Sequence, residues 1–186
     1  MHRGGKLPLR SKKGVAYFGI RRYNGEKGGV DMNRNTDYKA LGQLLEALAE
    51  GIPYETANLA NAAALLWEQL EDINWAGFYK MVEGKLVLGP FQGKPACIVI
   101  PVGRGVCGTA VAENATQLVY DVHQFPGHIA CDSASNSEIV VPLRVGGEIW
   151  GVLDIDSPFI GRFTEDDRRG LEDFSRILER CLENCK

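Results

Sequence analysis

The stretch from Ile139 to Ile155 reads Ile-Val-Val-Pro-Leu-Arg-Val-Gly-Gly-Glu-Ile-Trp-Gly-Val-Leu-Asp-Ile, and it decides the fold class. Two short runs rich in β-branched residues flank Gly146-Gly147, a pair typical of a tight hairpin turn. A hairpin pairs its strands antiparallel, whereas parallel strands need a long crossover. The stretch therefore predicts an antiparallel sheet.

Upstream, the same pattern occurs a second time. Residues 75–82 and 85–91 are apolar runs on either side of Gly84, and they predict another hairpin. Residues 96–101 predict one further strand. Strands joined by hairpins favour a largely antiparallel α+β sheet with helices packed on one side.

Three segments have helical spacing. Leu41, Leu44, Leu45 and Leu48 predict an amphipathic helix that ends before Gly51-Ile52-Pro53. Residues 54–70 predict a second helix with an alanine-rich stripe. Thr164 followed by three acidic residues predicts the start of a last helix, since acids favour the positive end of the helix dipole. The first two helices are expected to cover one face of the sheet.

The central stretch from Gly127 to Glu138 has neither a strand nor a helix period, and we expect an irregular loop between strands. It carries His128, Cys131 and two acids, Asp132 and Glu138. Reactive groups on loops held by rigid elements are typical of catalytic sites. The alternative is that Cys131 is a buried, inert thiol in a polar loop.

Length and charge limit the functional classes. The 186 residues fit one domain, with residues 1–35 as a flexible leader, Met32 as a second candidate start, and residues 36–186 as the domain. The net charge of −3 without a basic face argues against nucleic acid. Without a long apolar run we expect no membrane binding and a cytoplasmic protein, where thiols stay reduced.

Three of the five cysteines lie in the predicted sheet and loop region: Cys97, Cys107 and Cys131. With His123 and His128 they could form a zinc site, but zinc sites use closely spaced ligand pairs, so we expect no metal. Cys107 continues an apolar stripe and fits a core position. Cys97 is predicted on a strand after a flexible turn, from which it could reach a loop cysteine such as Cys131. Two thiols that can meet make a redox pair. Cys181 and Cys185, near the C-terminus, are expected to be incidental.

Residues 103–108 match the dinucleotide fingerprint G-x-G-x-x-G. The helix that follows is short, and hairpins do not supply the parallel crossovers of a nucleotide-binding fold. We therefore reject that interpretation and expect no cofactor.

Asp154 and Asp156 are two residues apart on one strand, so both carboxylates should project from one face. Like charges on a partly buried face are costly unless a cation or a proton satisfies them. The alternative is that they cap the following turn. Trp75 could form an aromatic wall for this site, or it could simply pack in the core.

Several motifs together resemble a known family. They are residues 74–79 (Asn-Trp-Ala-Gly-Phe-Tyr), 88–93 (Leu-Gly-Pro-Phe-Gln-Gly), 103–110, 127–132, 135–139 and 151–157. The chain from Asp37 to Leu182 resembles the free methionine-(R)-sulfoxide reductases, which are stand-alone GAF domains. The resemblance implies an α+β fold with a GAF-like antiparallel sheet, helices packed on one side and an irregular active-site loop on the other.

The resemblance also implies roles. Cys131 would be the nucleophile, Cys97 the resolving thiol and Cys107 an auxiliary cysteine. The substrate would contact Trp75, Tyr79, Glu138, Asp154 and Asp156, and the three acids would also assist proton transfer. Free methionine sulfoxide would be the substrate, thioredoxin the reductant, and the protein a homodimer. The alternatives are a GAF sensor that binds a small molecule without chemistry, and a thiol peroxidase.

Overall fold

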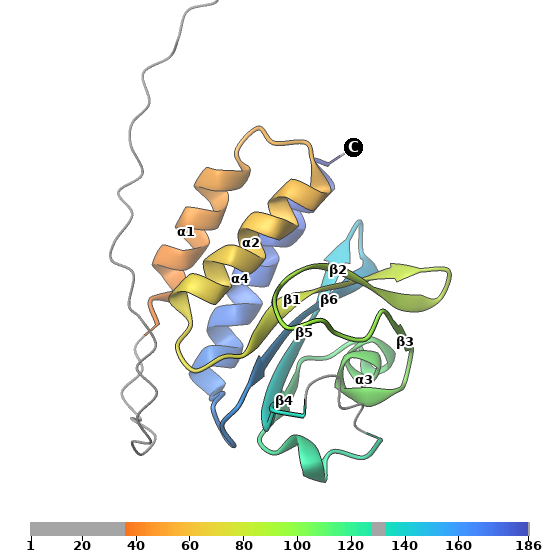
Figure 1. Ribbon diagram of the computed structural model, residues 1–186. Helices are drawn as coiled ribbons and strands as arrows, with labels where there is room; N and C mark the ends of the chain where they lie inside the picture. The colour runs from red at the N-terminus through yellow and green to blue at the C-terminus, as the bar shows by residue number, and fades with distance from the viewer. Residues whose placement is uncertain (1–35, 128–132, 186) are drawn as a thin grey trace, which may run out of the picture. The chain divides into compact units, whose positions relative to one another are not determined.

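The computed structural model describes residues 36–127 and 133–185, and all strands named here form one sheet (Figure 1). The strands are β1 (Trp75–Val82), β2 (Lys85–Gly93), β3 (Val99–Pro101), β4 (Gln117–Val119), β5 (Ser137–Val145) and β6 (Glu148–Ser157). Their order is β3-β2-β1-β6-β5-β4, and every neighbouring pair is antiparallel. Both predicted hairpins, and the antiparallel α+β class, are confirmed.

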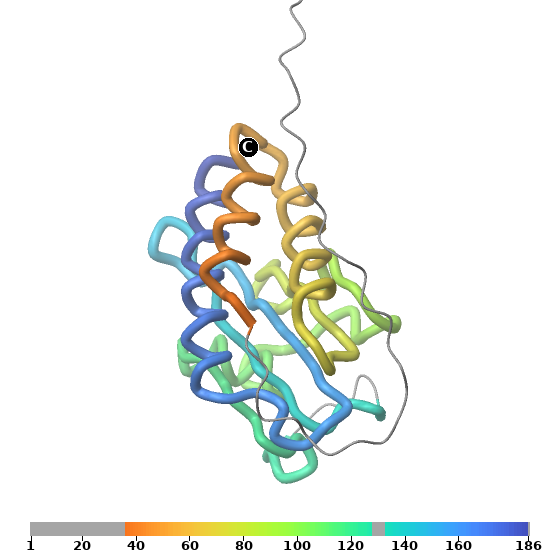
Figure 2. Tube along the Cα trace, turned by 90° about the vertical axis from the view of Figure 1, so that its left-hand side faces the viewer, coloured from red at the N-terminus to blue at the C-terminus, as the bar shows by residue number. Residues whose placement is uncertain are grey.

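Three helices lie on one side of this sheet: α1 (Tyr38–Ala49), α2 (Glu55–Gln69) and α4 (Glu165–Glu183). The helices α2 and α4 pack on the strands, and α1 packs on α2 and α4 from outside, as Figure 1 and Figure 2 together show. Their apolar stripes meet strand residues such as Phe78, Leu153 and Ile155 in one buried core. Thr164 and Asp167 form a reciprocal capping box at the start of α4, as expected from Thr164 and the acids after it.

The opposite face carries the fourth helix, α3 (Gly105–Glu113), and the short 3-10 turn η1 (Val122–Gln124). A second apolar cluster packs there, and Val106, Ala110 and Val122 belong to it. The predicted packing of helices on one side therefore holds for α1, α2 and α4, whereas α3 lies on the face that was expected to carry only the loop.

A buried ion pair fixes the helical side. Arg162 Nη1 lies 3.3 Å from Asp167 Oδ2, and the Tyr38 hydroxyl donates to Asp167 Oδ1 at 2.6 Å. This links α1 to the start of α4. Burial acts to raise the pKa of Asp167, but the Tyr38 hydrogen bond and the Arg162 charge outweigh it and hold that pKa below its ordinary value.

In the part of the chain that the structure describes, no helix has both the length and the apolar character that crossing a membrane requires.

Candidate active site

Strand register brings the predicted carboxylates together on the face away from the three long helices. Asp156 on β6 lies between Trp75 of β1 and Glu138 of β5, because it pairs with both. Residues directly opposite each other in an antiparallel pair share a face. Asp154 lies two positions along β6 and therefore projects from the same face, as predicted.

An aromatic stack forms one wall of the site. Trp75 is 3% exposed, and its ring lies 5.3 Å from the Phe91 ring and 5.9 Å from the Tyr79 ring, centroid to centroid. Its indole Nε1 donates to the Lys94 carbonyl at 3.1 Å, which fixes the orientation of the ring. A Cβ at position 77 would collide with Phe91 and come within 2.7 Å of Trp75 Cη2, so only glycine leaves room for this stack.

Two acids in the site are deeply buried. Glu138 and Asp154 are each 6% exposed. Burial raises the pKa of Glu138 well above its usual range, and the charges of Asp154 and Asp156 raise it further. Burial also raises the pKa of Asp154, to about 6, against the opposing effect of hydrogen bonds from its neighbours. The pair therefore keeps a proton near neutral pH.

One oxygen of this pair has no protein partner. Asp154 Oδ1 is buried and has no hydrogen-bond partner among the residues that the structure describes. A buried carboxylate oxygen without a donor is costly, so it is a natural acceptor for a group on a bound ligand.

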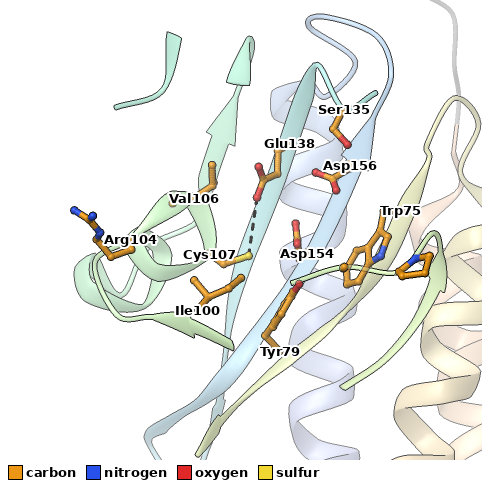
Figure 3. A pocket seen from close by; sticks show the side chains of 13 residues that line it. Trp75, Tyr79, Ile100, Arg104, Val106, Cys107, Ser135, Glu138, Asp154 and Asp156 are labelled. Atoms are coloured by element: carbon orange, nitrogen blue, oxygen red, sulfur yellow. Dashed lines mark hydrogen bonds between the residues drawn. The ribbon is translucent and has the colours of Figure 1, made fainter. Parts of the chain in front are cut away.

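Cys107 faces the two acids from α3. Its free thiol is 3% exposed, and Sγ donates to Glu138 Oε1 at 3.9 Å (dashed in Figure 3). Burial, followed by the charges of Asp154 and Glu138, raises the pKa of this thiol well above its usual range. Cys107 is therefore a protonated thiol at neutral pH, and a thiol is a poor nucleophile. It is also a member of the apolar cluster, as its stripe position predicted.

Sγ of Cys107 and carboxylate oxygens of Glu138 and Asp154 lie within 4.8 Å of one another, a spacing that could hold a cation. The raised pKa values of Cys107 and Glu138 mean that both groups hold protons at neutral pH, and a metal would have to displace them. The zinc alternative from the sequence shares Cys107 with this cluster but combined it with Cys97, Cys131, His123 and His128. Of these, His123 Nε2 is hydrogen-bonded to Asn136 Oδ1 at 2.9 Å and Cys97 is disulfide-bonded, whereas His128 lies outside the described residues.

Cys97 lies beside the pocket but not on a strand. The predicted strand over residues 96–101 is wrong in its first half, because β3 begins at Val99. Pro95 cannot donate to a ladder, and the chain turns before pairing with β2. The Tyr79 hydroxyl donates to the Cys97 carbonyl at 3.0 Å, which holds this segment against β1. Cys97 is disulfide-bonded, and its role as the resolving thiol stays a prediction.

The glycine-rich segment before α3 makes a tight turn. Gly103 and Gly105 have positive φ angles of 77° and 62°. A Cβ at Gly108 would collide with the Pro101 carbonyl oxygen. These glycines thus allow α3 to start close against β3, and the sheet around them is antiparallel, in agreement with the rejection of the nucleotide-binding interpretation.

These elements line a pocket that opens to solvent. Figure 3 shows its walls: the acids on β5 and β6, Cys107 and Val106 on α3, and Trp75 and Tyr79 on β1. All the predicted site residues in the described chain therefore meet at this pocket, with Cys97 at its edge. Cys131 lies in residues 128–132, outside the described part.

Three contributors were not selected from the sequence. Arg104 and Ser135 line the pocket, and Phe91 supports Trp75. Asn74 Nδ2 donates to Ser135 Oγ at 3.0 Å and so positions the segment that leads into β5. Phe91 and Ser135 both lie in motifs that carried the family resemblance, which was the available signal.

Comparisons with known proteins agree with this geometry. Residues 41–182 match the family model described as GAF domain. The chain is 58% identical over 151 residues to the free methionine-R-sulfoxide reductase of Escherichia coli, covering 81% of this chain and 92% of that protein.

Two solved structures are similar. One is the reduced form of the Staphylococcus aureus enzyme abbreviated fRMsr, with TM-score 0.78 and 51% identity, covering 80% of this chain and 96% of that one. The other is the Neisseria meningitidis free methionine-R-sulfoxide reductase in complex with its substrate, with TM-score 0.76 and 45% identity, covering 79% and 89%. With the matched fold, the pocket and these identities together, the chain belongs to the GAF-domain family of free methionine-R-sulfoxide reductases.

Proposed function

We propose that this protein reduces free methionine-R-sulfoxide to methionine, with Cys131 as the nucleophile and Cys97 as the resolving thiol. One observation carries the proposal. A disulfide-bonded Cys97 lies at a pocket where an aromatic stack faces buried, proton-holding acids. The Escherichia coli and Neisseria relatives, named as free methionine-R-sulfoxide reductases, support it.

The pocket has complementary groups for each part of a free amino acid. The methyl-sulfoxide end lies against Trp75, whose ring offers an apolar face. The ammonium pairs with Asp156 and the unpartnered Asp154 Oδ1. The substrate carboxylate accepts from backbone N–H groups in the first turn of α3, where Gly105 and Val106 line the pocket, and from the loop after Cys131. A pocket that holds both charged ends excludes peptides.

The chemistry needs a thiolate and a proton donor. The Cys131 thiolate attacks the sulfoxide sulfur, and Glu138 protonates the oxygen. The oxygen of this adduct then moves to Cys131 Sγ as the S–O bond and the new Sγ–S bond break; the electron pair stays on the substrate sulfur, methionine leaves, and Cys131 is left as a sulfenic acid. The Cys97 thiol then attacks Cys131 Sγ, water leaves, and the disulfide forms. Glu138 suits the donor role because its pKa is raised, so it still holds a proton at neutral pH.

Cys107 has an auxiliary role in this scheme. Its protonated thiol donates to Glu138 and so orients the acid that gives up its proton. Asp154 and Asp156 return a proton to Glu138 between turnovers.

The remaining parts of the proposal concern the bounds of the domain, the reductant, the location in the cell and the oligomeric state. Residues 36–186 form the functional domain behind a leader of residues 1–35, without a cofactor. A dithiol protein such as thioredoxin reduces the disulfide in the cytoplasm, and the enzyme is a homodimer.

The test is methionine production from free methionine-R-sulfoxide with dithiothreitol. Wild-type protein should produce methionine, and it should leave the S epimer and a peptide sulfoxide unreduced. Cys131→Ser should abolish production, while Cys181→Ser, at a half-buried position of α4 that does not line the pocket, serves as the matched control. Without added reductant, Cys97→Ser should release about one equivalent and stop.

Two results would contradict the assignment. A Cys131→Ser enzyme with normal turnover would exclude Cys131 as the nucleophile. Binding of the sulfoxide without any methionine from the wild type would favour a sensor, and faster consumption of peroxide than of sulfoxide would favour a peroxidase.

A further inference from the structure

The geometry points to a docking site for the protein reductant on the edge of the sheet beside Cys97. We call Ile98, Val99 and Val102 the β3 rim. This inference rests on the proposed function, because it concerns how the disulfide formed in that reaction is reduced. The proposed binding partner is a dithiol oxidoreductase with an apolar, acidic face around its reactive cysteine.

The β3 rim consists of exposed apolar side chains next to Cys97, whose sulfur takes part in the proposed redox reaction. The exposed fractions are 70% for Ile98, 49% for Val99 and 39% for Val102, whereas Ile100 between them is 4% exposed. Exposed apolar residues that cluster mark interaction sites more often than scattered ones do. A partner that attacks the disulfide at Cys97 must cover the residue that follows it.

The backbone of β3 is also open to a partner. β3 is an outer strand of the sheet, as Figure 1 shows. The Leu88 amide donates to the Ile98 carbonyl, and Val99 stands opposite Val87. In this antiparallel register the Val99 N–H and C=O point away from β2. An extended segment of a partner can bond to them, which is the way that strands add to a sheet edge.

The positive charge of the segment around the β3 rim favours a partner with an acidic face. Residues 84–112 contain three basic side chains, Lys85, Lys94 and Arg104, and no Asp or Glu, in a chain whose net charge is −3. An acidic face on the reductant would be attracted to this segment, and salt would weaken the association.

The redox step balances as two thiol–disulfide exchanges. A thiolate of the partner attacks Cys97 Sγ, the enzyme disulfide breaks, and its other sulfur leaves as a thiolate. The second thiol of the partner then attacks the mixed disulfide and releases the Cys97 thiolate. The partner becomes a disulfide, and the enzyme recovers both thiols.

The decisive experiment compares two reductants on one variant. Ile98→Gln combined with Val102→Gln should lower kcat/KM for thioredoxin, regenerated by its reductase and NADPH, by about tenfold. Turnover with dithiothreitol should not change, because a small dithiol needs no docking surface. Tyr54→Gln is the matched control, since Tyr54 is 69% exposed but lies on the helical side, at the start of α2.

A trapping experiment tests the attacked sulfur. A thioredoxin that keeps only its attacking cysteine should form a mixed disulfide at Cys97, located by peptide mass spectrometry, and Lys94→Gln should lower the salt dependence of trapping. An unchanged thioredoxin kcat/KM in the rim variant, or an adduct at Cys131, overturns the inference. So does an equal loss with dithiothreitol, because the rim would then serve the pocket. A wild type inactive with dithiothreitol would instead contradict the proposed function.

Discussion

The two faces of one sheet differ in what they bury. On β1 and β6, Phe78 and Ile155 point to the helices, while the adjacent Tyr79 and Asp154 point to the pocket. The helical face is filled with hydrocarbon, which stabilises the fold. The pocket face buries acids and a thiol that cost stability. Because side chains alternate along a strand, the same strands can serve both purposes.

The buried acids on the two faces are also perturbed in opposite directions. On the helical face, Asp167 has a lowered pKa because Tyr38 and Arg162 favour its charged form. On the pocket face, burial raises the pKa of Glu138 and Asp154. The charged form of the acid is favoured where it holds helices together, and the protonated form is favoured where a ligand is expected. Substitutions on the helical face should therefore lower stability, and substitutions on the pocket face should lower activity.

The largest effect is expected from Asp167→Asn. It leaves the Arg162 guanidinium, whose side chain is 1% exposed, without its counter-charge. The free energy of unfolding should fall by about 3–5 kcal/mol, measured by urea unfolding, with turnover per folded molecule unchanged. Asp173→Asn, at an exposed position of the same helix, is the control. A loss of activity without a loss of stability would contradict the division between the faces.

Glu138→Gln should lower activity without lowering stability, which is the reverse of the effect of Asp167→Asn. It removes the proposed proton donor while keeping the shape of the side chain, so kcat should fall about 10²–10³-fold with the unfolding midpoint preserved or raised. Glu148→Gln, at the exposed start of β6, should leave both quantities unchanged. If the stability of Glu138→Gln fell while kcat held, Glu138 would be structural rather than catalytic.

The pH dependence of stability should separate the faces. Between the ordinary pKa of Asp154, 3.8, and its folded value of about 6, the unfolded chain releases a proton that the folded protein keeps. Stability should therefore fall as pH rises through this window, and further as Glu138 is forced to ionise. Asp167 changes stability in the opposite direction, because its pKa in the folded protein is lowered. The stability that its ionised carboxylate contributes is lost as the pH falls below its ordinary pKa of 3.8.

The unfolding midpoint, measured at a series of pH values from about 3 to about 8, would check both predicted directions of the pH dependence. Glu138→Gln should flatten the decline at high pH and leave the acid side intact, whereas Asp167→Asn should do the opposite. A wild-type stability that rose steadily from acid to neutral pH would mean that the pocket acids are ionised.

Tyr79→Phe should have the smallest effect. It removes the hydrogen bond to the Cys97 carbonyl, worth about 1 kcal/mol. The rate of disulfide formation after one turnover, followed by thiol titration, should drop about fivefold, because the segment that carries Cys97 is held less firmly. Tyr54→Phe, at an exposed position, is the control. An unchanged rate would show that other contacts position Cys97.

Much of the fold was predictable because its signals are local. The diglycine between two β-branched runs gave the β5–β6 hairpin, and leucine spacing gave α1. The errors occurred where local patterns carry little information. Cys97 follows Pro95 within an apolar run that looks continuous, yet the strand β3 starts only at Val99. The short helix α3 gave no indication of which face it would cover, because tertiary packing decides that.

The site was partly predictable for the same reason. The shared face of Asp154 and Asp156 follows from strand periodicity alone. Glu138 stands opposite Asp156 within the predicted β5–β6 hairpin, whereas the pairing of Trp75 with Asp156 joins strands far apart in sequence, which only the family resemblance indicated. The stacking of Phe91 on Trp75, and the bond from Asn74 to Ser135, follow from packing that no single segment encodes.

The position of β6 has a consequence for biosynthesis. It is inserted between β1 and β5, so neither of those two strands has its inner neighbour until residues 148–157 have been made. A nascent chain that lacks them presents two open strand edges and has not yet brought its acids to Trp75. The ribosome must therefore release nearly the whole chain before the enzyme can acquire its chemistry, and a pause shortly before Glu148 is where aggregation would be most damaging.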